Sequence, residues 1–298
     1  MRLGRYTLFI LVVFACHACD KPDCPYADER LCDQAYLDSL GESINENCSD
    51  FDTIYKSRVL LEDFTGFRCT NCLPAAITAD NLQEEWCDRL VVVAYHVFPE
   101  FAAPLSTTPG DTFSIDLRTG LGENLAIDYG IPSLPNGMVN RKQFSGGFIQ
   151  SAASWPDNVG IEMDEEVIAE LYFDDLDYNP ISSASSFAMR VVPRSQVETD
   201  WNLTIGIYEN GIVDGQKDGS STIFPYTHDH VFRNYINGVY GETALTQSTV
   251  LDANGAVSFN YEVTAEEDWV ADNCYLFAVL FNSENDEVIG CTKTKFIP

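Results

Sequence analysis

The chain has 298 residues, enough for two domains of ordinary size, and 45% of them are hydrophobic, which excludes wholesale disorder. Its 46 acidic residues outnumber 17 Lys and Arg, and the net charge of −29 argues against nucleic acid as a partner, because such a surface repels phosphate backbones. The charge is typical of an exported protein that must stay soluble.

Residues 1–19 have the features of a bacterial export signal. Two arginines precede an apolar run over 6–15, which is shorter than the roughly 20 residues that a permanent membrane helix needs. The run ends in Ala15-Cys16-His17-Ala18-Cys19, and a small residue before a Cys resembles the lipobox of lipoproteins, whose Cys is acylated. Cys16 fits the lipobox position better, because it directly follows the apolar run. Lipidation of Cys19 leaves a polar start and eight cysteines, an even number that suits complete pairing, so we favour Cys19 over Cys16.

Residues 20–52 form a polar, cysteine-bearing leader or tether, and an α/β pattern follows over 53–167. A strand, a helix and a near-continuous apolar strand make a βαβ unit. The predicted strands are 59–64, 90–96 and 137–144, and the predicted helices are 73–86, 123–129 and 155–163, with an insertion over 98–120.

Residues 168–298 have the short alternating strands of an all-β, immunoglobulin-like sandwich domain. Turn clusters at Asp214-Gly215, Asp218-Gly219 and Asn254-Gly255 separate them. The predicted strands are 170–175, 187–192, 203–209, 257–263, 275–282 and 287–296.

Cys69 and Cys72 form the motif that carries chemistry. The spacing also suits zinc sites and structural disulfides, but a zinc site needs a second ligand pair nearby and none follows, so we predict neither a metal nor another cofactor. Cys69 lies at the carboxyl end of a predicted strand and opens a helix, whose N-terminus stabilises a thiolate. Cys72, one turn further in and more buried, would resolve a mixed disulfide.

The stretch Asp63-Phe64-Thr65-Gly66-Phe67-Arg68-Cys69-Thr70-Asn71-Cys72 resembles the active-site segment of thioredoxins, where an Asp-Phe pair precedes the first Cys by the same interval. Tyr129-Gly130-Ile131-Pro132-Ser133-Leu134-Pro135 is similar to the segment that leads to their cis-proline. The resemblance implies that Cys69 is the nucleophile and Cys72 the resolving thiol. It makes Asp63 the buried carboxylate that exchanges a proton with Cys72, and Pro135 the residue, after a cis bond, that shapes the peptide-binding edge. Burial should raise the pKa of Asp63.

Two positions depart from the thioredoxin pattern. Arg68 stands where thioredoxins have Trp, and its charge would lower the pKa of Cys69 and make the pair more oxidising. Thr70-Asn71 replaces Gly-Pro between the cysteines. Both changes leave the redox potential and the direction of exchange open.

Over about residues 58–296 the chain resembles the Omp28-related outer-membrane lipoproteins. The resemblance rests on the segment 61–66, the Cys69/Cys72 pair, the stretch from Pro135 to Asn140-Arg141, and Thr227-His228-Asp229-His230-Val231-Phe232-Arg233. It implies a cell-envelope protein, anchored in the outer membrane by its N-terminal lipid, with a thioredoxin-like domain before a β domain. It implies no settled activity.

Two functions follow from these observations. The first is thiol–disulfide exchange with a protein thiol or disulfide partner. The alternative is a non-enzymatic binding or assembly lipoprotein, in which Cys69–Cys72 is a permanent disulfide and the partner is a surface protein.

The remaining cysteines have structural interpretations. Cys274 and Cys291 flank the last predicted hairpin, and opposed positions there would form a cross-strand disulfide. Cys24, Cys32, Cys48 and Cys87 allow three pairings, among which the sequence does not choose.

Three histidines lie in informative positions. His96 ends a predicted central strand, where it would be a hydrogen-bonded core or rim residue near the Cys pair. His228 and His230, two residues apart, would face one side of a strand. Because no third ligand lies nearby in sequence, we interpret them as turn or rim residues rather than metal ligands.

Overall fold

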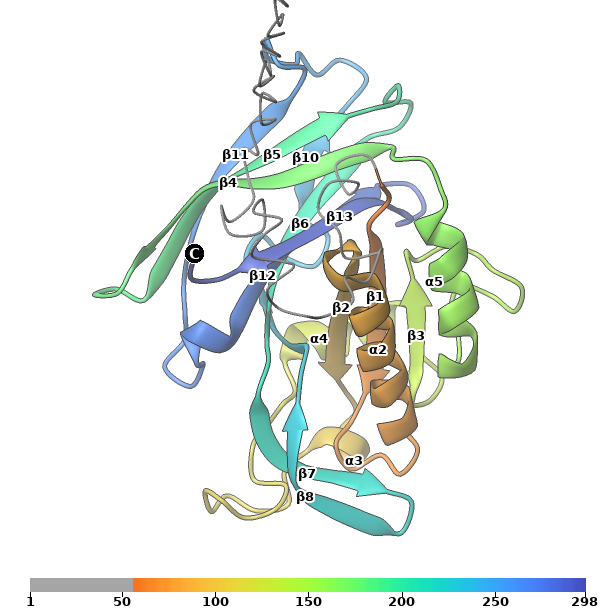
Figure 1. Ribbon diagram of the computed structural model, residues 1–298, viewed down its shortest axis with the longest axis vertical. Helices are drawn as coiled ribbons and strands as arrows, with labels where there is room; N and C mark the ends of the chain where they lie inside the picture. The colour runs from red at the N-terminus through yellow and green to blue at the C-terminus, as the bar shows by residue number, and fades with distance from the viewer. Residues whose placement is uncertain (1–55) are drawn as a thin grey trace, which may run out of the picture. The chain divides into compact units, whose positions relative to one another are not determined.

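The computed structural model describes residues 56–298 (Figure 1). The signal over 1–19, lipidation at Cys19 or Cys16, the tether over 20–52 and the pairing of Cys24, Cys32 and Cys48 lie outside the described residues and stay predictions. Within residues 56–298, no helix combines the length and apolar character needed to cross a membrane.

The fold begins with two parallel strands joined by a helix. β1 (Val59–Thr65) and β2 (Leu90–His96) are buried along their whole length and pair residue by residue. α2 (Leu73–Trp86) connects the two strands, and its apolar face packs on the sheet. An unbroken apolar run is what a strand covered on both faces requires. The predicted βαβ unit is therefore confirmed.

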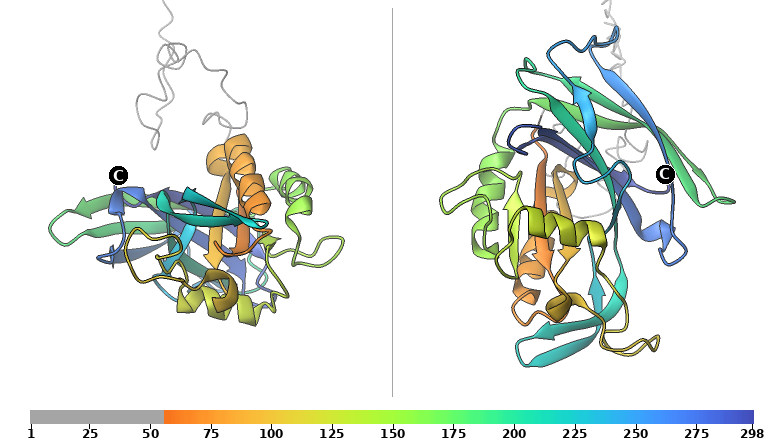
Figure 2. Two further views of the ribbon diagram at one scale, coloured as in Figure 1. Left: turned by 90° about the horizontal axis from the view of Figure 1, so that it is seen from below. Right: turned by 180° about the vertical axis from the view of Figure 1, so that it is seen from behind.

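The rest of the first half covers this unit. α2 and α5 (Trp155–Met163) share one apolar core on one face of the sheet, whereas α4 (Gly120–Asp128) packs on the other face. Figure 1 views the molecule from the α2 side, and the reverse view in Figure 2 brings α4 to the front. The short elements are η3 (Cys87–Arg89), α3 (Pro99–Ala102) and η4 (Ala152–Ser154).

β3 (Asn136–Val139) pairs antiparallel with β1 and is shorter than the predicted strand over 137–144. The chain turns after Val139 because Asn140 and Arg141 both adopt positive φ angles, 48° and 52°. The side chains of Asn140 and Arg141 are buried. The Asn140 Oδ1 accepts a hydrogen bond from the Leu60 N–H, and Arg141 pairs with the buried Glu62.

The second half is made of strands, and the six strands predicted there are confirmed. Four more were not predicted: β7 contains a bulge, β8 is almost wholly exposed, and β9 and β10 are short. The full set is β4 (Ala169–Asn179), β5 (Ala184–Pro193), β6 (Trp201–Glu209), β7 (Ile212–Asp218), β8 (Ser221–His228), β9 (Val231–Tyr235), β10 (Glu242–Leu245), β11 (Val257–Thr264), β12 (Cys274–Asn282) and β13 (Val288–Lys295), with η5 (Ala271–Asn273) before β12.

Strands from both halves share one sheet. Its order is β13-β12-β6-β9-β2-β1-β3, with β10 paired to β6. β9 lies parallel to β2 at Ala94 and Val231, and the Ala94 N–H donates to the His230 carbonyl at 2.8 Å. The smaller sheets are β11-β5-β4 and the hairpin β7-β8. The architecture is therefore mostly β, with several sheets.

Two large cores lie on opposite faces of the second half of this sheet. One joins side chains of β1 and β2 to those of β6, β9 and β12, so it contains residues from both sides of the predicted domain boundary at residue 168. The other fills the space between β6 and β12 on one side and the three-stranded sheet on the other.

The predicted disulfide between Cys274 and Cys291 is wrong: both thiols are free and buried. β12 and β13 do form the predicted hairpin, but Cys291 lies opposite Val279, and the far end of the ladder pairs Tyr275 with Lys295. Along β12, Cys274 therefore lies several residues from Val279, the position opposite Cys291. The two cysteine side chains also belong to different cores. Burial raises the pKa of each thiol to about 12.

Candidate functional site

Cys69 and Cys72 are joined in a disulfide immediately before α2, with their Cα atoms 5.4 Å apart. Cys72 is the N-cap residue of α2, and Cys69 lies in the turn between β1 and the helix. Both are nearly inaccessible, with 2% of Cys69 and 1% of Cys72 exposed. Cys69 is therefore as deeply buried as Cys72, whereas the sequence predicted an outer, more exposed residue.

The β7–β8 hairpin lies over the turn that carries these cysteines. The Lys217 N–H donates to the Phe67 carbonyl at 2.8 Å, and the Gly219 N–H donates to the Thr70 carbonyl at 3.1 Å. Figure 1 shows the hairpin beside α3 and the start of α2. The two backbone hydrogen bonds hold this hairpin against the Cys69 turn.

Asp214 attaches the hairpin to the insertion. Its buried carboxylate accepts backbone N–H groups of Phe113 at 2.5 Å, Ser114 at 2.9 Å and Ile115 at 2.8 Å, besides that of Gly215. The Asp214-Gly215 pair is thus a bulge inside β7, and the prediction of a turn there is wrong. We call the β7–β8 hairpin together with residues 113–117 the cap.

Arg68 contacts the insertion as well. Its backbone N–H donates to the Phe101 carbonyl at 2.9 Å, and its guanidinium donates to the Ala103 carbonyl at 2.8 Å. The side chain that replaces the thioredoxin Trp is therefore bound to carbonyl groups at the end of α3.

Asp63 lies on the face of β1 that packs against α2, and only 2% of it is exposed. Its Oδ1 atom is buried without a hydrogen-bond partner among the described residues. Burial raises the pKa of this carboxyl to about 8, with a further contribution from the charge of Asp80. The predicted rise in its pKa is confirmed.

Pro135 follows a cis peptide bond with Leu134, as predicted. The register of β3 against β1 pairs Asn136 with Phe64, one residue before Thr65. Pro135 is thereby brought to the end of β1 from which the turn with Cys69 starts.

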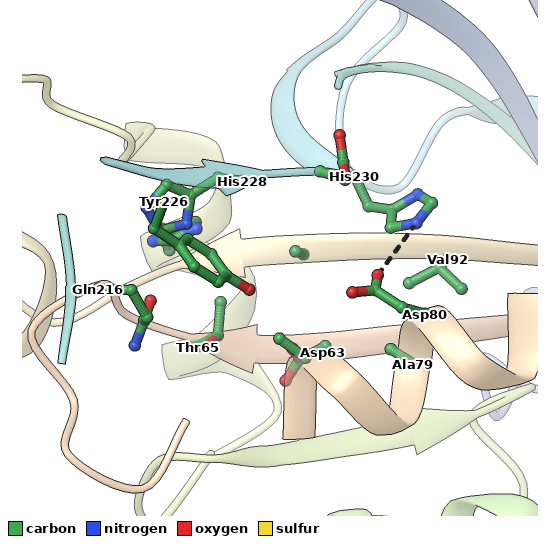
Figure 3. A pocket seen from close by; sticks show the side chains of 13 residues that line it. Asp63, Thr65, Ala79, Asp80, Val92, Gln216, Tyr226, His228 and His230 are labelled. Atoms are coloured by element: carbon green, nitrogen blue, oxygen red, sulfur yellow. Dashed lines mark ion pairs between the residues drawn. The ribbon is translucent and has the colours of Figure 1, made fainter. Parts of the chain in front are cut away.

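A small cavity of about 30 Å³ opens beside Asp63, with room for about two water molecules. It combines residues of β1, α2 and β2 with residues of the hairpin and of the link before β9 (Figure 3). Its polar lining is Asp63, Thr65, Asp80, His96, Gln216, Tyr226, His228, Asp229 and His230.

The three predicted histidines meet at this cavity, although His228 ends β8 and His230 adopts a positive φ of 59° in the link to β9, so they do not face one side of one strand. The rings of His96 and His228 lie 5.5 Å apart, and Phe67 contacts both. The His228 Nε2 lies 3.1 Å from the Gly215 carbonyl.

Burial lowers the pKa of all three histidines, to about 4 for His228, about 3 for His230 and well below the usual value for His96. They are neutral at pH 7. Nδ1 atoms of His96 and His230 have no hydrogen-bond partner among the described residues. Within residues 56–298, no three His, Cys, Asp or Glu side chains are arranged to hold a metal ion.

Sequence reasoning missed Asp80, Gln216, Tyr226 and Asp229. Asp80 follows the buried Ala79 on α2, and a carboxylate beside the apolar stripe of a helix is a signal that could have drawn attention to it. The other three reach the cavity only because the hairpin and the link after it fold onto α2.

A family model described as outer membrane protein Omp28 matches residues 123–297. The match begins after the Cys69/Cys72 pair. No curated protein matches the chain.

Among solved structures, the chain is similar to HBP35 of Porphyromonas gingivalis, with a TM-score of 0.60 at 17% identity over 81% of this chain and 76% of that chain. A protein of Agrobacterium tumefaciens has a TM-score of 0.47 at 10% identity over 80% of this chain and 93% of that chain. A domain of the outer membrane lipoprotein Omp28 from P. gingivalis has a TM-score of 0.30 at 15% identity over 44% of this chain and 90% of that domain.

The likeness to HBP35 shows a shared fold. The family match covers more than half of the sequence, including most of the β-rich half and β3. The chain therefore belongs to the Omp28 family of outer membrane proteins.

Proposed function

We propose that this outer membrane protein exchanges disulfides with a protein partner at Cys69 and Cys72, in a thioredoxin-like domain over 53–167 that precedes the β domain over 168–298. The observation that carries the proposal is a disulfide at the start of α2 beside a strand with a buried carboxylate, Asp63, whose Oδ1 has no hydrogen-bond partner among the described residues. Pro135, which precedes β3 and is brought beside the end of β1 by the pairing of the two strands, supports it.

The exchange would begin when a partner thiolate attacks Cys69 and Cys72 leaves as a thiolate. A second partner thiol then releases the partner as a disulfide. Two electrons and two protons pass from the partner dithiol to Cys69 and Cys72 in total. Asp63, which is mostly protonated at pH 7 with a pKa of about 8, would give its proton to the departing Cys72 thiolate.

The second candidate is a binding or assembly protein in which the disulfide is permanent. The deep burial of both cysteines under the cap supports this function, because structural disulfides resist attack when they are inaccessible.

The reduction potential of the full chain, measured by equilibration with a thiol buffer and mass spectrometry of the Cys69/Cys72 peptide, separates the two functions. We expect a potential between about −270 and −120 mV, the range of known oxidoreductases. We also expect Cys72→Ser to trap mixed disulfides with partners in cells. Cys69→Ser is the matched control and should trap none.

A potential below about −300 mV, without trapped partners, would establish the permanent disulfide instead.

We also propose that a lipid on Cys19, with Cys16 as the alternative, attaches the chain to the membrane. Cys19→Ser should release the protein from the membrane fraction, whereas Cys16→Ser should leave it attached. The opposite result would place the lipid on Cys16.

A further inference from the structure

The cavity beside Asp63 has the features of a proton path. A carboxyl group that gives a proton to Cys72 in each exchange must regain it from solvent, yet Asp63 is buried and its Oδ1 has no hydrogen-bond partner among the described residues. The cavity is the open space that Asp63 borders, and it has room for about two water molecules. Water in this cavity can therefore lie beside Asp63.

Asp80, on α2, lines the same cavity as Asp63. About 48% of its side chain is exposed, so this carboxylate contacts both solvent and the cavity. Its Oδ1 lies 3.8 Å from the Nε2 of His230, which Figure 3 shows pointing towards Asp80. The His230 Nδ1 is buried and has no hydrogen-bond partner within residues 56–298. Because the ring is neutral, one of its nitrogens can accept a hydrogen bond while the other donates one.

The path begins close to the cysteines. Ala76, which lines the cavity, donates its backbone N–H to the Cys72 carbonyl at 3.0 Å, and Asp80 lies one helical turn further along α2. One helix thus carries the resolving cysteine, the cavity wall and the exposed carboxylate in succession.

We propose that Asp80 and His230 are positioning residues that return protons from solvent to Asp63 through this cavity. The inference rests on the proposed exchange at Cys69 and Cys72. In each reduction of the disulfide, Asp63 gives one proton to the Cys72 thiolate, and Asp80 takes one from solvent and passes it on, so that no charge remains buried.

The charged groups around the cavity favour transfer of a proton from Asp80 to Asp63. Asp80 faces Glu84 on its own helix, Asp63 on β1, His96 on β2, Tyr226 and His228 on β8, and Asp229 and His230 in the link before β9. Burial, together with Asp229 and Glu84, raises the pKa of Asp80 to about 6, so Asp80 exchanges protons with water near neutral pH. The pKa of Asp63, about 8, is higher, and a proton on Asp80 therefore moves inward.

The test is the rate at which dithiothreitol reduces the Cys69–Cys72 disulfide in the full chain between pH 5 and 9. We expect Asp80→Asn to slow reduction at least about tenfold at pH 7, in keeping with the contribution of a positioned acid. His230→Gln should slow it less. Added imidazole, a small acid that can approach the exposed position of residue 80 from solvent, should restore the rate of Asp80→Asn.

Two controls separate a proton path from a structural effect. Asp80→Glu keeps the carboxylate and should keep the rate. Glu85→Gln removes a charge from an exposed position of the same helix that does not line the cavity, and it should also keep the rate. Rates are compared at each pH, so that the ionisation of dithiothreitol cancels.

An unchanged rate in Asp80→Asn at every pH, or a slow rate that imidazole does not restore, would overturn the proton path. Because dithiothreitol needs no natural partner, this result differs from failure of the proposed function. A reduction potential in the range of structural disulfides would overturn the exchange function, whatever the rate of Asp80→Asn.

Discussion

Asp63 occupies a position that packing alone would give to an aliphatic side chain. Val59 and Leu61 precede it on the same face of β1, and both are fully buried against α2. An ionised carboxylate in this place loses its hydration, and its Oδ1 gains no hydrogen bond from the described part of the chain, so burial favours the protonated form. Asp63 therefore makes the stability of the protein depend on pH.

Asp63→Asn should remove this dependence. The folded-state pKa is raised from 3.8 to about 8, so the stabilising contribution is present at low pH and is lost as pH rises through 8. The slope approaches about 1.4 kcal/mol per pH unit for one proton. Urea unfolding from pH 4 to 9 should show Asp63→Asn gaining stability over the unchanged protein as pH rises, with the gap constant above pH 9.

The matched control is Asp157→Asn, at an exposed position of α5, whose profile should parallel that of the unchanged protein. Parallel profiles for Asp63→Asn would show that Asp63 is already ionised at low pH.

The opposite face of β1 carries a buried ion pair. Arg141 donates two hydrogen bonds to Glu62, each at 2.8 Å, and its guanidinium lies 5.4 Å from the ring centres of both Tyr129 and Phe281. Both partners are almost completely shielded from solvent. The pair joins β1 to the turn after β3 and to β12.

Arg141→Met should destabilise the fold by about 3–5 kcal/mol, because it leaves the Glu62 carboxylate buried without its partner. The double variant Glu62→Gln with Arg141→Met should cost less than Arg141→Met alone. Urea unfolding at pH 7 measures Arg141→Met, Glu62→Gln and the double variant. If the double variant cost the sum of the two single changes, the pair would contribute nothing as a pair.

At the scale of elements, the cap is hydrogen-bonded to the turn that carries the disulfide. Phe113, Leu117 and Ile212 of the cap pack with Phe67 and Val231 in a separate apolar cluster. Gly215 lies so close to the insertion that a Cβ atom there would come within 2.4 Å of Thr112. The hairpin and the insertion therefore behave as one packed unit over the Cys69 turn.

Asp214→Ala should loosen the cap, because it leaves the backbone N–H groups of Phe113, Ser114 and Ile115 without their acceptor. Hydrogen bonds to a charged group contribute about 1.5–3 kcal/mol each, so we expect dithiothreitol to reduce Cys69–Cys72 at least about tenfold faster. Asp218→Ala, at an exposed position of the same hairpin, is the control. Equal rates in both variants would mean that the cap does not limit access.

The strands that the sequence did not predict have a common physical cause. β8 is almost wholly exposed and contains Pro225, because a two-stranded hairpin has no core face of its own to impose alternation. β7 is interrupted by the bulge at Asp214 and Gln216. β1 and β2, by contrast, were predictable because both faces of each strand are covered and the sequence is apolar throughout.

At the scale of the molecule, the two halves depend on one another. β9 closes the edge of β2, and the core on the α4 side places Tyr208, Phe232 and Phe277 of the second half against Val93 and Tyr95 of the first. Strands from both sides of the predicted boundary at residue 168 thus share one sheet and one core. Neither half can be separated without exposing this core.

A fragment of residues 56–167 should therefore fail to fold cooperatively, whereas residues 56–298 should unfold in a single transition. Circular dichroism during urea unfolding measures both, with residues 56–298 as the control. A sharp transition in the shorter fragment would show that the first half is an independent folding unit, and the shared core would then contribute little.

The sequence by itself determined the βαβ unit, the cysteine motif with Asp63 six residues before it, the cis-proline and the family. These are local signals: an apolar run, a fixed spacing, a dipeptide. Only the tertiary structure decided that Asp80, His96, His228 and His230 border one cavity, that the cap is hydrogen-bonded to the Cys69 turn, and that Cys274 lies far from Cys291. The physical reason is that strand register and the docking of the hairpin depend on contacts between residues far apart in the chain, such as Asp214 and Ser114, which are 100 positions apart.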